Sequence, residues 1–236
     1  MNYVILAAGR SERFGRNKLE EKFHGKSLPR LAAEFASRNG ASNIYLTISR
    51  SSIITDGRRI YHPVLEEVSE VCSPIIGFQS EELYGPGAAI STWRGIIEGP
   101  FVVLFGDNYY GGDLGPYLDI FGDPQDQNTY FTTLPLAPNP RNLQLSAVID
   151  GYVMEKPHNH VQGDYFCGMV RFPAGCFGYF EDLRKSDRGE VEITDMINMS
   201  PRSIPVNLKT TGIVWDDLTY QSDIERIRRL VGSEGQ

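Results

Sequence analysis

Residues 3–18 read YVILAAGRSERFGRNK, and this stretch determines the class of fold. The continuous apolar run Tyr3-Val-Ile-Leu6 is typical of a strand buried on both faces of a parallel sheet. Small residues follow at positions 7–9, and four cations lie within nine positions: Arg10, Arg13, Arg16 and Lys18. Backbone amides of a loop with small residues can cradle phosphate oxygens. The stretch therefore predicts a polyphosphate site at the edge of an α/β sheet.

The glycine spacing of this loop excludes the two commonest phosphate motifs. Its glycines are Gly9 and Gly15, so neither G-x-G-x-x-G nor G-x-x-x-x-G-K-[ST] is present. A dinucleotide-binding fold and a P-loop thus lose their main support. A solvated basic turn stays open as the alternative to a phosphate site.

Helical and strand periodicities alternate after the loop. Ser27 has the character of a helix cap, Pro29 suits the first turn, and Gly40 ends the apolar helical pattern. Further elements are expected as strands at 43–48, 74–78 and 101–105 and a helix at about 87–98. This order predicts βαβ units, whose ligands bind at the carboxyl ends of the strands.

The second half of the chain has shorter β segments. Strands are expected at 129–136, within 144–155 around an Asp150-Gly151 turn, and at 165–172. Helices are expected at about 176–185 and 220–231. The sequence predicts a single domain over 1–236, with a nucleotide-binding half at 1–113 and a mixed-sheet half at 114–236 that could close a pocket.

Composition excludes several classes of protein. The chain has 236 residues, is 41% hydrophobic and carries a formal charge of −7, which argues against a nucleic-acid-binding coat. Cys72, Cys167 and Cys176 lack zinc-site spacing and are expected to be reduced thiols. No apolar run has the length of a membrane span or the flanks of a signal peptide, so we expect a cytoplasmic protein without a membrane partner. His158 and His160 lack a third metal ligand and are expected in an exposed turn.

Six segments resemble, in family order, those of the sugar-1-phosphate nucleotidyltransferases, or NDP-sugar pyrophosphorylases. The signature loop is LAAGRSERFGRNK, which departs from the usual family pattern at Ser11 and Glu12. The other segments are Tyr84-Gly-Pro-Gly-Ala-Ala-Ile90, Val103-Leu-Phe-Gly-Asp-Asn-Tyr109, Val153-Met-Glu-Lys-Pro157, Arg188-Gly-Glu-Val-Glu-Ile-Thr-Asp195 and Val214-Trp-Asp-Asp-Leu-Thr219. The segment at 188–195 is close to that of the glucose-1-phosphate thymidylyltransferases.

The resemblance implies a Rossmann-like nucleotidyltransferase (GT-A-like) fold, with a mixed central sheet and helices on both faces. It implies condensation of a sugar 1-phosphate with a nucleoside triphosphate, dTTP or UTP favoured, to an NDP-sugar and pyrophosphate. Mg²⁺ would be the cofactor. The quaternary state stays open, with a homo-oligomer among the options.

The resemblance also implies a role for individual residues. Arg13 and Lys18 would act on the triphosphate, and Asp107 and Asp217 would bind the metal. The nucleotide-binding residues would be Leu6, Ala8, Gly9, Gln79, Gly85 and Gly87. The sugar-phosphate-binding residues would be Glu155, Lys156, Gly168 and Arg188.

Simpler explanations stay open for three of these carboxylates. Asp107 could cap a helix, Asp216 could replace Asp217, and Glu155 could form an ion pair on a strand. The segment Asn142–Ser146 replaces a Tyr-Gly pair that reads glucose in relatives, so another sugar, or choline phosphate taken by a cytidylyltransferase, stays open. A GT-A glycosyltransferase and a non-catalytic nucleotide-sugar-binding protein are further classes of function that the sequence allows.

Overall fold

Four parallel strands form the centre of the sheet. They are β1 (Asn2–Ala7), β4 (Asn43–Ile48), β7 (Ile75–Phe78) and β8 (Phe101–Phe105), in the spatial order β7-β4-β1-β8. The computed structural model describes residues 1–236 apart from 57–58, 116, 137–144, 158–162, 181–182 and 234–236. Because the strands are parallel, the loops that follow β1 and β8 emerge at the same edge of the sheet.

The second half of the chain extends the same sheet with antiparallel pairs. Strand β13 (Asp164–Phe172) runs antiparallel to β8 and pairs with β10 (Thr129–Pro135) and β11 (Ala147–Ile149). β11 forms a hairpin with β12 (Tyr152–Met154), and β14 (Ser203–Asn207) pairs parallel with β10. The hairpin turn lies at Asp150 and Gly151, both with positive φ, as that sequence predicts. The sheet is therefore mixed.

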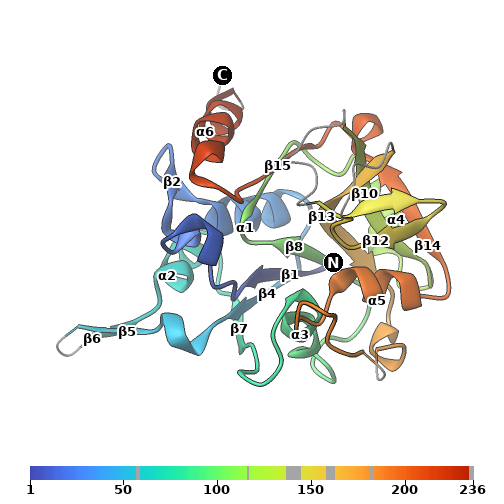
Figure 1. Cartoon of the computed structure of the whole chain (residues 1–236), viewed down its shortest axis with the longest axis horizontal. Coiled ribbons are helices and arrows are strands. Elements are labelled where there is room, and N and C mark those ends of the chain that lie inside the picture. The colour runs from blue at the N-terminus through green and yellow to red at the C-terminus, as the bar shows by residue number, and fades with distance from the viewer. Residues whose placement is uncertain (57–58, 116, 137–144, 158–162, 181–182, 234–236) are drawn as a thin grey trace.

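Helices cover both faces of the sheet (Figure 1). Successive strand residues point to opposite faces, so Tyr3 and Ile5 enter one core while Val4 and Leu6 enter another. The first core contains residues of α1 (Leu28–Arg38), α2 (Pro63–Ser69) and α4 (Tyr117–Gly122). The second contains residues of α3 (Pro86–Ser91) and α5 (Ile193–Met199). The predicted mixed α/β fold with helices on both faces is confirmed.

A separate two-stranded ladder lies beside the parallel core. Strand β9 (Asn108–Gly111) pairs antiparallel with β15 (Val214–Asp217), and the following α6 (Ile224–Ser233) packs on a cluster that includes Phe14 and Tyr109. The ladder register places Asn108 opposite Asp217, and the Leu218 N–H donates to the Asp107 carbonyl at 3.0 Å. The ladder thus brings two distant parts of the sequence together.

The remaining elements are short. Small hairpins are formed by β2 (Lys22–Phe23) with β3 (Lys26–Ser27) and by β5 (Ile54–Asp56) with β6 (Arg59–Tyr61), the second projecting from the body (Figure 1). Single 3₁₀ turns lie at Glu12–Phe14, Lys18–Glu20, Arg50–Ser52, Cys176–Gly178, Leu208–Thr210 and Gln221–Asp223. In the described ranges, no helix is both long and apolar enough to cross a bilayer.

Several predicted helix bounds were wrong. The helix expected at 87–98 ends at Ser91, and Gly95 lies beyond it with φ +73°. In place of the helix expected at 176–185, the described residues form only a 3₁₀ turn, because Phe177 stacks on Phe101 and holds the chain against the sheet. The last helix begins at Ile224, after a 3₁₀ turn capped by Asp223.

Candidate active site

A cavity of about 330 Å³ opens at the carboxyl ends of β1 and β8. Residues from both halves of the chain line it. It is lined by every residue to which the resemblance gives a role except Gly87: Leu6, Ala8, Gly9, Arg13, Lys18, Gln79, Gly85, Asp107, Glu155, Lys156, Gly168, Arg188 and Asp217. Side chains from distant parts of the sequence therefore share one chamber.

Gly87 has a packing position instead of a place in the cavity lining. Its N–H donates to the Val191 carbonyl at 2.8 Å, and a Cβ there would lie 2.7 Å from the Val191 side chain. The expected contact of Gly87 with the nucleotide stays a prediction, because Gly87 does not line the cavity. Gly87 lets α3 approach the segment that carries Glu190 and Glu192.

The loop after β1 is held by its own polar groups. Ser11 has φ +55°, a left-handed conformation that favours glycine, and its hydroxyl accepts the Lys18 N–H at 3.2 Å. The Leu6 carbonyl accepts the Gly106 N–H at 2.8 Å, which joins the ends of β1 and β8. Ser11 thus stands where the family usually has glycine, and its side chain closes the loop.

Lys18 connects three segments at the floor of the cavity. Its ammonium lies 2.5 Å from the Asp107 carboxylate and donates to the Leu218 carbonyl at 3.0 Å. Asp107 precedes strand β9, so the predicted alternative of a helix cap is wrong. A cation and a carboxylate from the two sheet-edge loops are thus directly paired.

Asp216 and Asp217 have different surroundings because neighbouring strand residues face opposite sides. Asp217 lines the cavity, and its carboxylate accepts the Thr219 hydroxyl at 2.5 Å. Asp216 is bound by Arg226, whose Nη2 donates to it at 2.8 Å, and these carboxylate contacts raise the pKa of Arg226 despite burial. The geometry therefore separates a cavity carboxylate from a structural one.

Gly168 gives the cavity room beside strand β9. It has φ +68°, and a Cβ would lie 2.4 Å from the Asn108 side-chain oxygen. Its carbonyl accepts the Tyr110 hydroxyl at 2.9 Å, while the Trp215 indole N–H donates to Asn108 at 2.9 Å. A larger residue at 168 would displace this network.

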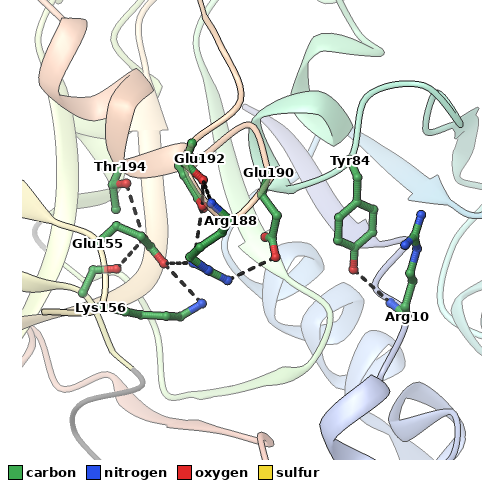
Figure 2. A network of polar contacts seen from close by, with 10 residues as sticks. Arg10, Tyr84, Glu155, Lys156, Arg188, Glu190, Glu192 and Thr194 are labelled. Atoms are coloured by element: carbon green, nitrogen blue, oxygen red, sulfur yellow. Dashed lines mark hydrogen bonds and ion pairs between the residues drawn. The ribbon is translucent and has the colours of Figure 1, made fainter. Parts of the chain in front are cut away.

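A charged network occupies the end of the cavity formed by the second half of the chain (Figure 2). Nη1 of Arg188 donates to Glu155 at 2.6 Å and to Glu192 at 3.3 Å, and Nη2 donates to Glu190 at 3.1 Å. The Lys156 ammonium lies 3.2 Å from Glu155, on a backbone with φ +36°, an unusual conformation for a non-glycine residue. The ion pair proposed as the simpler role of Glu155 is thus present.

Burial acts on two carboxyls of this end. It raises the pKa of Glu192, and the neighbouring Glu155 charge adds to the rise, whereas the Ser186 hydrogen bond and Arg188 oppose it. Burial and Glu155 also raise the pKa of Asp195. Negative charge is therefore crowded here.

The opposite end of the cavity contains an amide and an aromatic ring. Gln79 is 8% exposed, and its Nε2 donates to the Leu83 and Gly85 carbonyls at 3.4 and 3.5 Å. The Arg10 guanidinium lies 4.3 Å from the Tyr84 ring centroid, and the Tyr84 hydroxyl accepts a hydrogen bond from the backbone N–H of Arg10 at 3.2 Å (Figure 2). The sequence analysis did not predict this pairing. The signal that could have indicated it is the aromatic residue Tyr84 directly before Gly85-Pro86-Gly87.

The donor set fits Mg²⁺. This ion prefers one or two carboxylates and completes its octahedron with water and phosphate oxygens. Asp107 and Asp217 line the same cavity, and no cluster of three or more His, Cys, Asp or Glu suited to a metal occurs in the described part of the chain. His158, His160 and residues 142–144 lie outside the described residues.

Residues 3–88 match the model of the MobA-like NTP transferase domain. The first part of the chain is therefore similar to a nucleotidyltransferase domain. "Bifunctional protein GlmU" of Methanocaldococcus jannaschii is 26% identical over 235 residues, covering 95% of this chain and 52% of that protein. The protein of the same name from Methanococcus aeolicus is 31% identical over 152 residues, which cover 62% of this chain and 35% of that protein. The chain thus spans about a third to a half of the length of these curated relatives.

Solved structures share the fold of this chain. A Bacillus anthracis protein assigned as a glucose-1-phosphate thymidylyltransferase has a TM-score of 0.79 at 19% identity, covering 98% of this chain and 94% of that chain. A UDP-glucose pyrophosphorylase complexed with UDP-glucose has a TM-score of 0.76 at 17% identity, and the match covers 98% of each chain. The inositol-1-phosphate CTP transferase from T. maritima has a TM-score of 0.74 at 12% identity, and the match covers 100% of this chain and 96% of that chain. The predicted family resemblance is confirmed.

Proposed function

We propose that the chain is a Mg²⁺-dependent nucleotidyltransferase that joins a sugar 1-phosphate to a nucleoside triphosphate, releasing pyrophosphate. The observation that carries this proposal is the cavity itself, where cations of the β1 loop meet two carboxylates and a second group of cations. The related domain model and the GlmU relatives support it. The product would be an NDP-sugar.

The reaction brings two anions together. An oxygen of the acceptor phosphate forms a bond to the α-phosphorus, the bond from that phosphorus to the bridging oxygen breaks, and pyrophosphate leaves with the electron pair. Two unit charges about 4 Å apart interact by about 4 kcal/mol at an effective dielectric near 20. Positioned cations that offset this repulsion are the main requirement for catalysis.

Each charged residue has a place in this scheme. Arg13 would bind the departing phosphates through its planar fork, and Lys18 would turn from Asp107 toward the α-phosphate. Asp107 and Asp217 would hold Mg²⁺, which when bound neutralises triphosphate charge. Lys156 and Arg188 would hold the acceptor phosphate, with Glu155 accepting a hydroxyl hydrogen.

The proposed preference for dTTP or UTP rests on Gln79. With Nε2 donating to backbone carbonyls, its amide oxygen is the atom that would accept the N3–H of thymine or uracil. The cytosine amino group could donate to the same oxygen, so CTP is the second nucleotide to examine. The test is Mg²⁺-dependent pyrophosphate release with the common nucleoside triphosphates against a panel of sugar 1-phosphates, inositol 1-phosphate and choline phosphate.

The screen separates the proposed enzyme from its rivals. A reactive pair identifies the nucleotide and the acceptor together. A folded protein that binds nucleotide sugars but releases no pyrophosphate with any pair would be a sensor. Transfer of sugar from an NDP-sugar without pyrophosphate release would indicate a glycosyltransferase, for which the Arg13 and Lys18 loop has no evident purpose.

A further inference from the structure

The acceptor end of the cavity carries more negative than positive charge among the described residues. Three carboxylates, Glu155, Glu190 and Glu192, converge on the Arg188 guanidinium, and Lys156 pairs with Glu155. All five side chains line the cavity, and they come from the segments after β12 and before α5 (Figure 2). The two cations assigned to the acceptor phosphate are therefore already occupied by carboxylates.

Binding a phosphate dianion here would uncover negative charge. As Lys156 and Arg188 turn to the phosphate, the carboxylates that they now neutralise lose their partners. The side chains of Glu155 and Glu190 are only 21% and 25% exposed, so solvent compensates them incompletely. Unpaired charge in a partly buried place is unfavourable. The acceptor must therefore supply positive charge to the carboxylates that lose their cationic partners.

Resting on the function proposed above, we propose that the acceptor is a phosphate ester that also carries a protonated amine. Its phosphate takes the cations, and its ammonium takes their place at Glu190 and Glu155. Hydroxyl groups of a neutral sugar can also donate to carboxylates but bring no charge, whereas an ammonium brings a positive charge and three donors. The ammonium therefore offsets one of the carboxylate charges that the phosphate uncovers, which a neutral sugar cannot do.

The surroundings of the three carboxylates favour Glu190 as the principal amine contact. Glu192 is 4% exposed and is held by the Ser186 hydroxyl at 2.8 Å, and Glu155 is held by the Ser146 hydroxyl at 2.8 Å. Glu190 is the most exposed of the three, and the side-chain contact described for it is with Arg188. Burial is the main cause of the raised pKa of Glu192, and the neighbouring Glu155 charge adds to the rise.

The test compares acceptors that differ in one charge. Glucosamine 1-phosphate is compared with glucose 1-phosphate and N-acetylglucosamine 1-phosphate, and 2-aminoethyl phosphate with 2-hydroxyethyl phosphate. We expect the amine member of the productive set to have a kcat/KM for pyrophosphate release higher by about tenfold to a hundredfold, as for a hydrogen bond to a charged group. The two sets distinguish an amino sugar phosphate from an amino alcohol phosphate.

The variant Glu190→Gln tests the contact. It should bring the ratio of amine to neutral kcat/KM close to one, while the control Glu70→Gln, at an exposed carboxylate outside the cavity lining, should retain the wild-type ratio. A wild-type preference for neutral acceptors, or a ratio unchanged by Glu190→Gln, would overturn the inference. Pyrophosphate release from neutral acceptors alone would leave the proposed function standing, whereas silence with every acceptor would remove both. If the Glu190→Gln protein fails to fold, the comparison of amine and neutral acceptors with the wild-type protein still decides the question, because it needs no variant.

Discussion

Lys18 and Asp107 form an ion pair with 2.5 Å between the ammonium nitrogen and a carboxylate oxygen. One residue follows β1 and the other follows β8, so the pair joins the two loops at which an open α/β sheet binds ligands. The side chains are 15% and 27% exposed. A positive charge thus lies against the carboxylate proposed to hold Mg²⁺.

Replacing Lys18 should affect turnover more than folding. Lys18→Met removes the charge proposed for the α-phosphate, and we expect kcat to fall by about 10²–10³, the usual cost of losing one preorganised donor. Pyrophosphate release measures this. Lys22→Met is the matched control, because Lys22 pairs with Glu67 outside the cavity lining and should keep turnover. Full kcat in Lys18→Met would show that the Lys18–Asp107 pair is structural only.

The neighbouring aspartates of β15 should separate catalysis from stability. Asp217→Asn should lower Mg²⁺-dependent turnover by about 10² or more, because a metal supplies several kcal/mol of charge stabilisation. Asp216→Asn weakens the Arg226 contacts and should lower the free energy of unfolding by about 1–3 kcal/mol while turnover persists. Urea unfolding and pyrophosphate release on both variants provide the comparison, and the reverse pattern would reassign the metal carboxylate to 216.

Arg171 should be essential for stability. It is fully buried and donates to the backbone carbonyls of Phe121, Asp123, Asp126 and Asn128 at 2.7–3.2 Å. Arg171→Met removes the donor of all four carbonyls and the buried charge that they stabilise, and we expect a loss of about 3–5 kcal/mol in the free energy of unfolding. The exposed Arg202→Met control should change it by less than about 0.5 kcal/mol. Equal melting curves for the two variants would refute this role.

His62 should make folding less favourable in mild acid. Burial lowers the pKa of His62 below its usual 6.5, and the Ser49 backbone and Glu20 charge only partly offset this. Below pH 6.5 the unfolded chain therefore binds a proton that the folded chain does not, so stability falls as pH decreases, by at most about 1.4 kcal/mol per pH unit for one group. His62→Leu should reduce the slope of unfolding free energy between pH 6.5 and 5, measured by urea titration. An unchanged slope would exclude His62 as its source.

The sequence predicted the parallel core well because its signals are local. The apolar runs at 3–6 and 101–105 and the Ser27 cap depend on neighbouring residues, and the structure has β1, β8 and α1 there. The expected helix at 176–185 failed because the packing of Phe177 on Phe101 involves residues far apart in the sequence. Such tertiary contacts leave no local periodicity.

The sequence predicted those parts of the site in which the residues of the motifs line the cavity themselves. Asp217 was chosen over Asp216 by its place after Trp215, and strand alternation places it in the cavity. The Arg10–Tyr84 stack and the convergence of Glu190 and Glu192 on Arg188 depend on folding of distant loops. The packing of Gly87 against Val191 was not predicted, because a glycine needed for close packing resembles one that approaches a ligand.

The identity of the phosphorus products tests the central claim most directly. ³¹P NMR should follow wild-type protein with Mg²⁺, the reactive triphosphate and its acceptor phosphate. The account predicts that a new diphosphate diester and inorganic pyrophosphate appear in equal amounts, and that Asp107→Asn abolishes both. Orthophosphate and a nucleoside diphosphate, or a nucleoside monophosphate with the acceptor unchanged, would instead show hydrolysis and contradict the transfer.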